Sequence, residues 1–281
     1  MIDPKAARRA FDHAATSYDA AAVVQREVGR RLIERLALMR ARPARVLDLG
    51  SGTGETTEAL AAALPGARIT ELDFAPAMLA RARSRVPWGA RLKRRRAFVC
   101  ADCRRLPFAD ASFDFVFSNL ALQWAPDADA QYREIARVLA PGGLLLFSTL
   151  GSDTLAELRV AFAAADHGVH VHPFADLHDV GDALLAAGLA EPVMDCERIT
   201  LTYAAVGDLL RDLKDLGAHN ADSDRARGLS SPRAFARMRE RYERERDADG
   251  RLPATWDIVY GHAWGAAPRP MSALHVAPPR R

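Results

Sequence analysis

The sequence of 281 residues contains only three cysteines, and this scarcity excludes a fold held together by disulfide bonds. A chain with so few cysteines is typical of a reducing compartment. Residues 1–19 also lack the apolar core of a signal peptide. We therefore expect the protein to work in the cytoplasm.

Long apolar runs and a large net charge are also missing. No run of uncharged apolar residues approaches the roughly 20 residues that cross a bilayer, so we expect no membrane association. The 39 Lys and Arg residues nearly balance the 36 Asp and Glu residues, which argues against a protein dedicated to binding nucleic acid. Hydrophobic residues, by contrast, make up 49% of the chain, enough for a large folded core.

Short apolar segments alternate with amphipathic ones through the first half of the chain. Apolar spacings of three and four residues predict a helix within residues 5–40. Five strands and three helices then follow, with strands at 46–49, 67–74, 96–102, 113–120 and 144–150 and helices at 56–64, 76–86 and 127–141. This alternation predicts an α/β fold with a mostly parallel, Rossmann-like sheet that has helices on both faces.

The second half has a looser pattern. It predicts helices at 154–166, 176–188, 206–217 and 231–246 and two more strands at 191–203 and 254–265. The sheet should therefore contain seven strands. Ligands of such sheets bind at the carboxyl ends of the strands, which directs attention to the residues found there.

A glycine-rich turn follows the first strand, with the sequence DLGSGTGE from Asp48 to Glu55. A dinucleotide-binding turn would need glycine where Glu55 stands. The acidic residues Asp48 and Glu55 also disfavour a pyrophosphate, which prefers the bare amides of a helix N-terminus. They suit a ligand that carries positive charge and no phosphate, such as S-adenosyl-L-methionine, and glycine lets the backbone approach it closely.

Polar residues stand at the ends of the next three strands. Asp73 could accept hydrogen bonds from both ribose hydroxyls, Asp102 could accept one from the adenine amine, and Asn119 should lie beside the methyl group. The alternative is that the glycines form an ordinary turn and the aspartates cap helices. The order of the four features favours a cofactor site.

Several segments resemble the successive motifs of class I S-adenosylmethionine-dependent methyltransferases, namely VLDLGSGTG, ITELDFAPAML, CADCRRLPFADASFDFVFSNLALQW and VLAPGGLLLFSTL. The resemblance implies a helical lid over residues 1–42, a cofactor-binding core over 43–150, substrate-covering helices with the last strands over 151–265, and a disordered tail over 266–281. The expected cofactor-binding residues are Gln25, Arg26, Asp48, Gly50, Gly52, Gly54, Asp73, Met78, Asp102, Cys103 and Asn119.

A narrower resemblance extends along nearly the whole chain, through AFDHAATSYDAAAVVQREV, SNLALQW, LLRDLKDLGAHN and LPATWDIVYGHAWG. These segments are similar to the malonyl-acyl-carrier-protein O-methyltransferase family. The resemblance implies methylation of the free carboxylate of a malonyl thioester, the step that begins pimeloyl formation in biotin synthesis. GSDTLAELR and PATWDIVYG also resemble a respiratory complex I assembly factor associated with arginine hydroxylation, and a silent cofactor-binding scaffold is a third alternative.

A malonyl carboxylate is ionised at neutral pH, because an unperturbed carboxyl pKa is about 4. It needs no general base, and catalysis should come from positioning the carboxylate against the methyl group. We expect Tyr18, Gln123 and Trp124 to orient it, with packing as the alternative role for both aromatic residues. Lys214 and Asn220 are further candidates, although both could equally lie on a solvated helix end.

Residues 81–96 contain eight Lys or Arg residues and no acidic residue. Acyl carrier proteins are acidic, so this stretch could dock one, although a solvated loop is an equally simple interpretation. The residues expected to dock are Arg91, Lys93, Arg94, Arg95 and Arg96.

Two patterns could suggest a metal site. Cys100 and Cys103 form a C-x-x-C pair, but only one cysteine remains elsewhere, and zinc sites of this type need a second pair. Four histidines, His167, His170, His172 and His178, gather in a later segment, which we interpret as a polar loop near the substrate entrance. We expect no metal.

Overall fold

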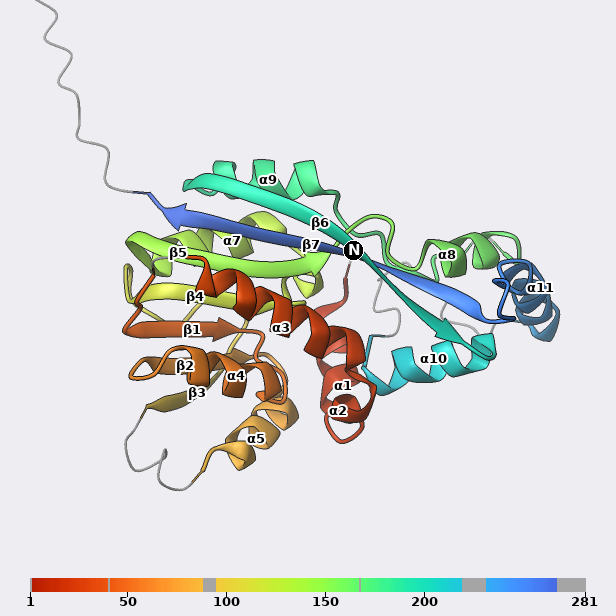
Figure 1. Ribbon diagram of the computed structural model, residues 1–281, viewed down its shortest axis with the longest axis horizontal. Helices are drawn as coiled ribbons and strands as arrows, with labels where there is room; N and C mark the ends of the chain where they lie inside the picture. Colours follow the sequence, from red (N-terminus) through yellow and green to blue (C-terminus); the bar gives the residue numbers. More distant parts are fainter. Residues whose placement is uncertain (1, 40, 88–94, 167, 219–230, 267–281) are drawn as a thin grey trace, which may run out of the picture.

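The computed structural model describes residues 2–39, 41–87, 95–166, 168–218 and 231–266 (Figure 1). Its strands form one sheet in the order β3-β2-β1-β4-β5-β7-β6, and only the pairs that involve β7 are antiparallel. The strands are β1 (Arg45–Leu49), β2 (Arg68–Asp73), β3 (Arg96–Cys100), β4 (Phe113–Asn119), β5 (Leu139–Leu150), β6 (Leu189–Tyr203) and β7 (Leu252–Gly265). The predicted seven-stranded, mostly parallel sheet is confirmed.

Helices precede, connect and follow these strands. They are α1 (Pro4–Ala14), α2 (Tyr18–Ala21), α3 (Val23–Ala37), α4 (Glu55–Ala63), α5 (Pro76–Arg85), the short 3-10 helix η1 (Leu122–Trp124), α7 (Ala128–Val138), α8 (Ala156–Ala163), α9 (Leu177–Ala186), α10 (Val206–Asp215) and α11 (Pro232–Glu243). None of the helices in the described ranges is both long enough and apolar enough to cross a membrane.

The central strands are apolar on both sides because both faces of the sheet are covered. Side chains alternate between the faces, so Phe115 and Phe117 of β4 pack with residues of α3 and α4 on one face. The intervening Val116 packs with residues of α7 and α9 on the other face. Burial on both faces explains the near-continuous apolar run that marks these strands in the sequence.

The parallel strands β1 and β4 are neighbours although β2 and β3 lie between them in the sequence. The chain therefore reverses its direction of sheet growth after β1, and a crevice opens at the carboxyl ends of β1 and β4. This crevice is where the sequence predicts the cofactor.

The N-terminal segment differs from the single helix predicted over residues 5–40. It forms three helices, because the backbone turns at residues 15–17 and again at Ala22, whose ψ is +44°. The Ser17 hydroxyl donates a hydrogen bond to the backbone carbonyl of Asp215, 3.0 Å away, which ties the first turn to α10. Competing hydrogen bonds of this kind commonly interrupt helices.

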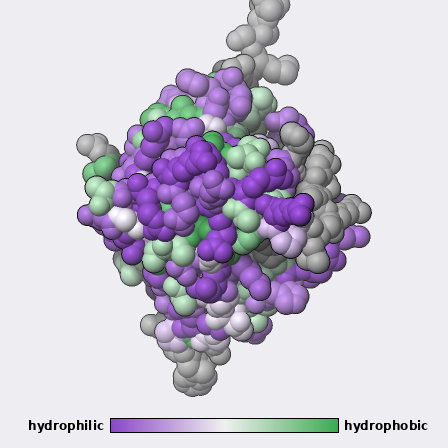
Figure 2. Space-filling model, turned by 90° about the vertical axis from the view of Figure 1, so that its right-hand side faces the viewer, coloured by the Kyte–Doolittle hydropathy of each residue, from purple (hydrophilic) through white to green (hydrophobic). Residues whose placement is uncertain are grey.

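Helices α8, α10 and α11 lie together at the right-hand end of the molecule, beyond the carboxyl ends of the parallel strands, where β6 and β7 extend toward them (Figure 1). Figure 2 views this end directly and shows that hydrophilic residues cover most of it. The predicted tail falls almost entirely outside the described residues.

Candidate functional site

The glycine-rich turn joins β1 to α4 at the crevice. The backbone amides of Gly50 and Ser51 donate to the carbonyl of Leu72 at 2.7 and 3.0 Å, which fixes the turn against β2. Gly50 has a φ of +78°, and a Cβ there would lie 2.2 Å from Cβ of Ala121, so no other residue fits. Gly52 also has a positive φ, +55°, but a Cβ there would meet nothing within 4 Å.

Gly52 therefore faces open space, and it lines both of the cavities that meet at this turn. Gly54 does not line them. It begins α4, and a Cβ there would lie 2.9 Å from Ala82, so this glycine serves the packing of α4 against α5. Of the three predicted glycines, Gly50 and Gly52 shape the ligand site.

Asp73 ends β2 beside the turn. Its carboxylate accepts hydrogen bonds from the backbone amides of Gly52 at 2.9 Å and Ala75 at 2.8 Å. Burial nevertheless raises the pKa of Asp73 to about 6, because desolvation of the charge outweighs these two bonds. The carboxylate is thus held rigidly at the wall of the larger cavity and is mostly ionised at neutral pH.

Asp48 lies behind the turn at the end of β1. It is buried and accepts a hydrogen bond of 2.5 Å from the hydroxyl of Thr57. Burial raises the pKa of Asp48 to about 7, and the neighbouring carboxylate of Glu71 adds to the rise. Asp48 lines only the smaller cavity, where its charge changes near neutral pH.

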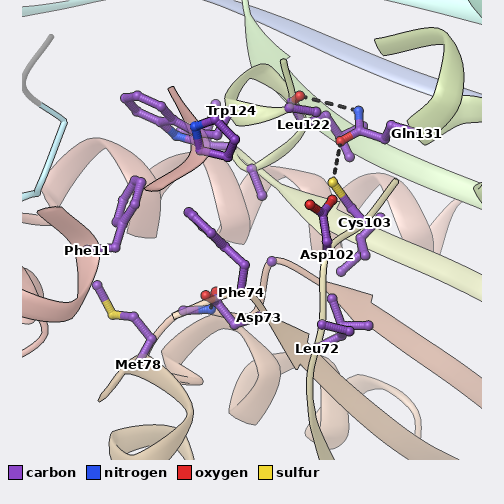
Figure 3. A pocket seen from close by; sticks show the side chains of 18 of the residues that line it. Phe11, Leu72, Asp73, Phe74, Met78, Asp102, Cys103, Leu122, Trp124 and Gln131 are labelled. Atoms are coloured by element: carbon purple, nitrogen blue, oxygen red, sulfur yellow. Dashed lines mark hydrogen bonds between the residues drawn. The ribbon is translucent and has the colours of Figure 1, made fainter. Parts of the chain in front are cut away.

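The larger cavity, which we call the cofactor cleft, has a volume of about 780 Å³ and extends from the turn across the end of β2 to η1. Figure 3 shows its aromatic and apolar side chains around Asp73. Phe11 makes edge contacts with Phe74 and Trp124, at ring distances of 5.7 and 5.1 Å. Met78 also lines the cleft, from the first turn of α5.

Asp102 and Cys103 lie on the opposite side of the cleft from Met78 (Figure 3). The Cys103 thiol donates to Oε1 of Gln131 at 3.1 Å, and Nε2 of Gln131 donates to the carbonyl of Leu122 at 3.3 Å. Burial raises the pKa of Cys103 to about 12, so the thiol stays protonated as this donor. Asp102 is paired with Arg104, whose Nη2 lies 2.6 Å away.

The smaller cavity, of about 400 Å³, lies on the other side of the turn and is also lined by Tyr18 and Asn119. Within the described residues, two buried atoms there have no hydrogen-bond partner, Oε1 of Gln25 and Oγ of Ser51. Unpaired buried polar atoms are costly, so this cavity suits a ligand with polar, hydrogen-bonding groups. The amino-acid end of S-adenosyl-L-methionine has such groups, and the aromatic and apolar lining of the cofactor cleft is chemically suited to an adenine ring.

Hydrogen bonds and ion pairs hold the N-terminal segment against the glycine-rich turn. Asp19 accepts a hydrogen bond of 2.6 Å from the Thr53 hydroxyl and pairs with Arg81 and Arg85 of α5. Burial would raise the pKa of Asp19, but these partners outweigh it and lower the pKa. Nδ2 of Asn119 donates to the carbonyl of Gln25 at 2.9 Å, which joins β4 to the same segment.

Arg26 lines the smaller cavity from this segment but is exposed. It donates to the carbonyl of Asp19 and lies 3.4 Å from Glu55. Tyr18 lines both cavities, so the segment supplies side chains to each. Whether residues 1–42 act as a lid stays a prediction.

Gln123, like Gly54, is a predicted site residue that lines neither of these two cavities. Its Nε2 donates to the carbonyl of Leu120 at 2.8 Å, and its Oε1 accepts from the Thr149 hydroxyl at 3.3 Å. The first bond closes the turn between β4 and η1, and the second holds η1 against β5. Trp124, one residue later, does line the cofactor cleft.

Arg96 corrects the expected docking set. Its side chain is only 8% exposed and its Nη2 lies 2.5 Å from Oε1 of Glu71, which is fully buried. An arginine paired in this way cannot meet a partner protein. Of the remaining residues of the set, Arg95 is exposed, and Arg91, Lys93 and Arg94 lie outside the described residues.

The aromatic residues that line the cleft and the residues that support it are not among the predicted site residues. Phe74 directly follows Asp73, so its place at the strand end could have indicated it. Phe11 and Gln131 come from α1 and α7, which are far from β2 in the sequence, and no local pattern marks either residue. Asn220 and His167 lie outside the described residues, and Lys214 is exposed at the end of α10.

All three cysteines are free thiols, including the C-x-x-C pair. Within the described ranges, no group of three or more His, Cys, Asp or Glu side chains is placed to hold a metal ion. His170 and His172 instead line a third, apolar cavity near η1.

Comparison with known proteins gives both a matching domain model and near-full-length relatives. Residues 47–147 match the family model described as a methyltransferase domain. The chain is 53% identical to a malonyl-[acyl-carrier protein] O-methyltransferase of Laribacter hongkongensis, over 97% of this chain and 93% of the relative. It is 52% identical to the protein of the same name from Gallionella capsiferriformans, over 96% of this chain and 93% of that one.

Solved structures share the fold. The YcgJ protein of Bacillus subtilis superposes with a TM-score of 0.60 at 17% identity, over 85% of this chain and all of that one. Phosphoethanolamine N-methyltransferase 2 of Haemonchus contortus, solved with S-adenosyl-L-methionine, gives 0.55 at 19% identity, over 91% of this chain and 57% of that one. The near-full-length identity to the curated relatives and the cleft at the end of β1 lead to one conclusion: the chain belongs to the malonyl-[acyl-carrier protein] O-methyltransferases, a family of enzymes that use S-adenosyl-L-methionine.

Proposed function

We propose that the protein methylates the free carboxylate of malonyl-acyl carrier protein and so forms a malonyl methyl ester thioester. The names of the relatives support this substrate and favour it over the arginine-hydroxylase alternative. The reaction would begin pimeloyl formation in biotin synthesis. Free thiols at the exposed Cys100 and Cys196 support a reducing compartment, and we place the enzyme in the cytoplasm.

The observation that carries the proposal is the kind of titratable groups around the cofactor cleft. Asp73 and Asp102 line the cleft, where we assign them to the adenosine, and Cys103 and Tyr18 have pKa values raised by burial. Apart from these two aspartates, no residue in the described lining of the cleft is placed to act as a base. A malonyl carboxylate is ionised already, and for this nucleophile a base is not needed.

Tyr18 is the residue best placed to orient the carboxylate. Burial raises its pKa, and the charges of Asp73 and Asp19 raise it further, so the phenol stays protonated and can donate a hydrogen bond. S-adenosyl-L-methionine supplies a methyl group on a positively charged sulfur when it is bound. Trp124 and Phe11 exclude water from the same side of the cleft, which keeps a carboxylate nucleophilic.

The test is methyl transfer with purified protein, S-adenosyl-L-methionine and malonyl-acyl carrier protein, followed by mass spectrometry of the carrier. We expect one methyl group on malonyl-acyl carrier protein and none on acetyl-acyl carrier protein, which has no free carboxylate. Absence of the ester, with cofactor binding verified by calorimetry, would disprove the proposed function.

The docking surface for the carrier protein is a finer proposal. Arg95 remains a candidate with Arg91, Lys93 and Arg94, but it stands just before the amino end of β3, whereas the cofactor cleft lies at the carboxyl ends of the strands. Helix α11 exposes Arg237 and Arg239 at the end of the molecule beyond the carboxyl edge. Electrostatic docking should respond to reversal of charge at the surface used.

The variants Arg95→Glu and Arg237→Glu separate these surfaces. The variant at the docking surface should raise the KM for malonyl-acyl carrier protein several-fold and leave the KM for malonyl-coenzyme A unchanged. Equal KM values for the carrier substrate in wild type and Arg95→Glu would remove the basic stretch from the docking surface.

A further inference from the structure

A cavity of about 700 Å³, which we call the apolar chamber, lies beside η1. Helix α8 contributes Leu158 and Phe162, its N-cap residue is Leu155, and helix α10 contributes Leu210 and Leu213. The remaining lining residues are Ile2, Trp124, His170, Val171, His172, Phe174 and Ala218. Of these residues, only Trp124 and the histidines are predicted from the sequence to lie near the substrate.

Among the residues that the structure describes, no lysine, arginine, aspartate or glutamate lines the chamber. The ring of His170 stacks on Phe162 at 3.9 Å and bonds to the carboxylate of Asp166 at 2.7 Å, so this histidine already has its partners. The ring of His172 makes an edge contact with Phe174 at 5.6 Å. An ionised carboxylate would lose its hydration here without gaining a cation, whereas a neutral carbon chain would be well placed.

Trp124 lines both the apolar chamber and the cofactor cleft. A ligand that passes this indole has one end in each cavity. The two cavities differ in chemistry, so a ligand with one charged end and one neutral end can bind in only one orientation.

We propose that the apolar chamber receives the neutral thioester and the carbon chain next to it, while the carboxylate stays on the cofactor side of Trp124. This inference rests on the proposed function. It names the neutral thioester arm as the part of the substrate that the enzyme recognises. A free dicarboxylate such as malonate would place a second charge in the chamber, and the enzyme should therefore reject it although it carries the reactive group.

Filling the chamber tests this proposal. The probe is malonyl-pantetheine with an amide nitrogen in place of the thioester sulfur, which stays intact during calorimetry. Leu213→Trp should weaken binding of the probe at least 10-fold and change the Kd of S-adenosylhomocysteine less than twofold. A probe affinity within twofold of wild type would overturn the proposal.

Two further variants make the result independent of misfolding. Leu213 is buried, whereas Leu210 is only partly buried, so Leu210→Trp fills the same chamber with less risk to folding. It should also weaken binding of the probe. Leu185→Trp is the matched control, because Leu185 is 55% exposed on α9 and lines neither cavity. It should leave both affinities unchanged.

The outcomes separate this inference from the proposed function. If wild type binds the probe and Leu210→Trp does not, the chamber holds a thioester arm even when malonyl-acyl carrier protein gives no ester. If the ester forms and both filled variants keep the wild-type KM, the reaction stands and the chamber is not its binding site. Malonate methylated as efficiently as the thioester would also overturn the inference.

Discussion

The cofactor cleft and the apolar chamber meet at Trp124 but are built in different ways. Most of the cleft comes from strand ends and turns, whose backbone amides and carboxylates are fixed by the sheet. The chamber comes from the N-terminus, η1, two helices and a loop, and its described lining residues are apolar apart from His170 and His172. Under our proposals, the sheet holds the cofactor and the surrounding helices select the substrate.

The largest effect on stability should come from breaking the buried ion pair of Arg96 and Glu71. Arg96→Met leaves the Glu71 charge without its partner and should lower the free energy of unfolding by about 3–5 kcal/mol in chemical denaturation. Burial raises the pKa of Glu71, so the loss should grow as pH rises and the carboxyl ionises.

Arg95→Met is the control for this variant, since Arg95 is exposed one residue earlier. Equal stabilities of the two variants would show that the pair does not support the cleft.

Gly50→Ala should damage the cleft next. The added Cβ would lie 2.2 Å from Ala121 at a φ of +78°, so the turn must shift. We expect a loss of about 2–4 kcal/mol in stability and of most S-adenosylhomocysteine binding by calorimetry. Gly250 has a similar φ of +72°, but a Cβ there would meet nothing within 4 Å. Gly250→Ala is therefore the control and should keep full cofactor affinity.

Asp73→Asn should weaken S-adenosylhomocysteine binding by about 10- to 100-fold, because a charged acceptor of the ribose hydroxyls is lost. The pKa of Asp73 is about 6 in the folded protein against 3.8 in the unfolded chain, so folding favours its protonated form. Its contribution to stability is therefore complete below about pH 4 and is lost as pH rises to 6.

In Asp73→Asn this part of the pH dependence should disappear, while the similar contribution of Asp48, whose pKa is about 7, should remain. Unfolding curves measured between pH 4 and 7 check this. An unchanged slope between pH 4 and 6 would contradict the assignment.

The smallest effect should be at Gln123, which lies between the two regions but lines neither. Gln123→Met removes hydrogen bonds to Leu120 and Thr149 and should cost about 1 kcal/mol of stability. The KM for the malonyl thioester should stay within twofold of wild type. A tenfold rise in KM would return Gln123 to the substrate site.

The same comparison explains what the sequence could predict. Alternating strands and helices predicted the sheet, and residues such as Gly50, Gly52 and Asp73 could be placed because each stands at the end of a recognisable strand. The chamber could not be predicted, because Ile2, Phe162 and Leu213 come from three distant segments whose apolar pattern is that of any amphipathic helix. The prediction that Arg96 docks a carrier protein was wrong for a related reason. Its neighbours in the sequence are basic, but its buried partner Glu71 belongs to another strand.

The central claim is that cofactor and thioester bind in separate cavities that share Trp124. It is tested most directly by titrating Asp73→Asn and Leu210→Trp with both S-adenosylhomocysteine and the malonyl-pantetheine amide. We predict that Asp73→Asn loses cofactor affinity and keeps the amide, and that Leu210→Trp loses the amide and keeps the cofactor. If either variant loses both ligands while its unfolding curve shows a folded protein, the two cavities are not separate sites and the account is wrong.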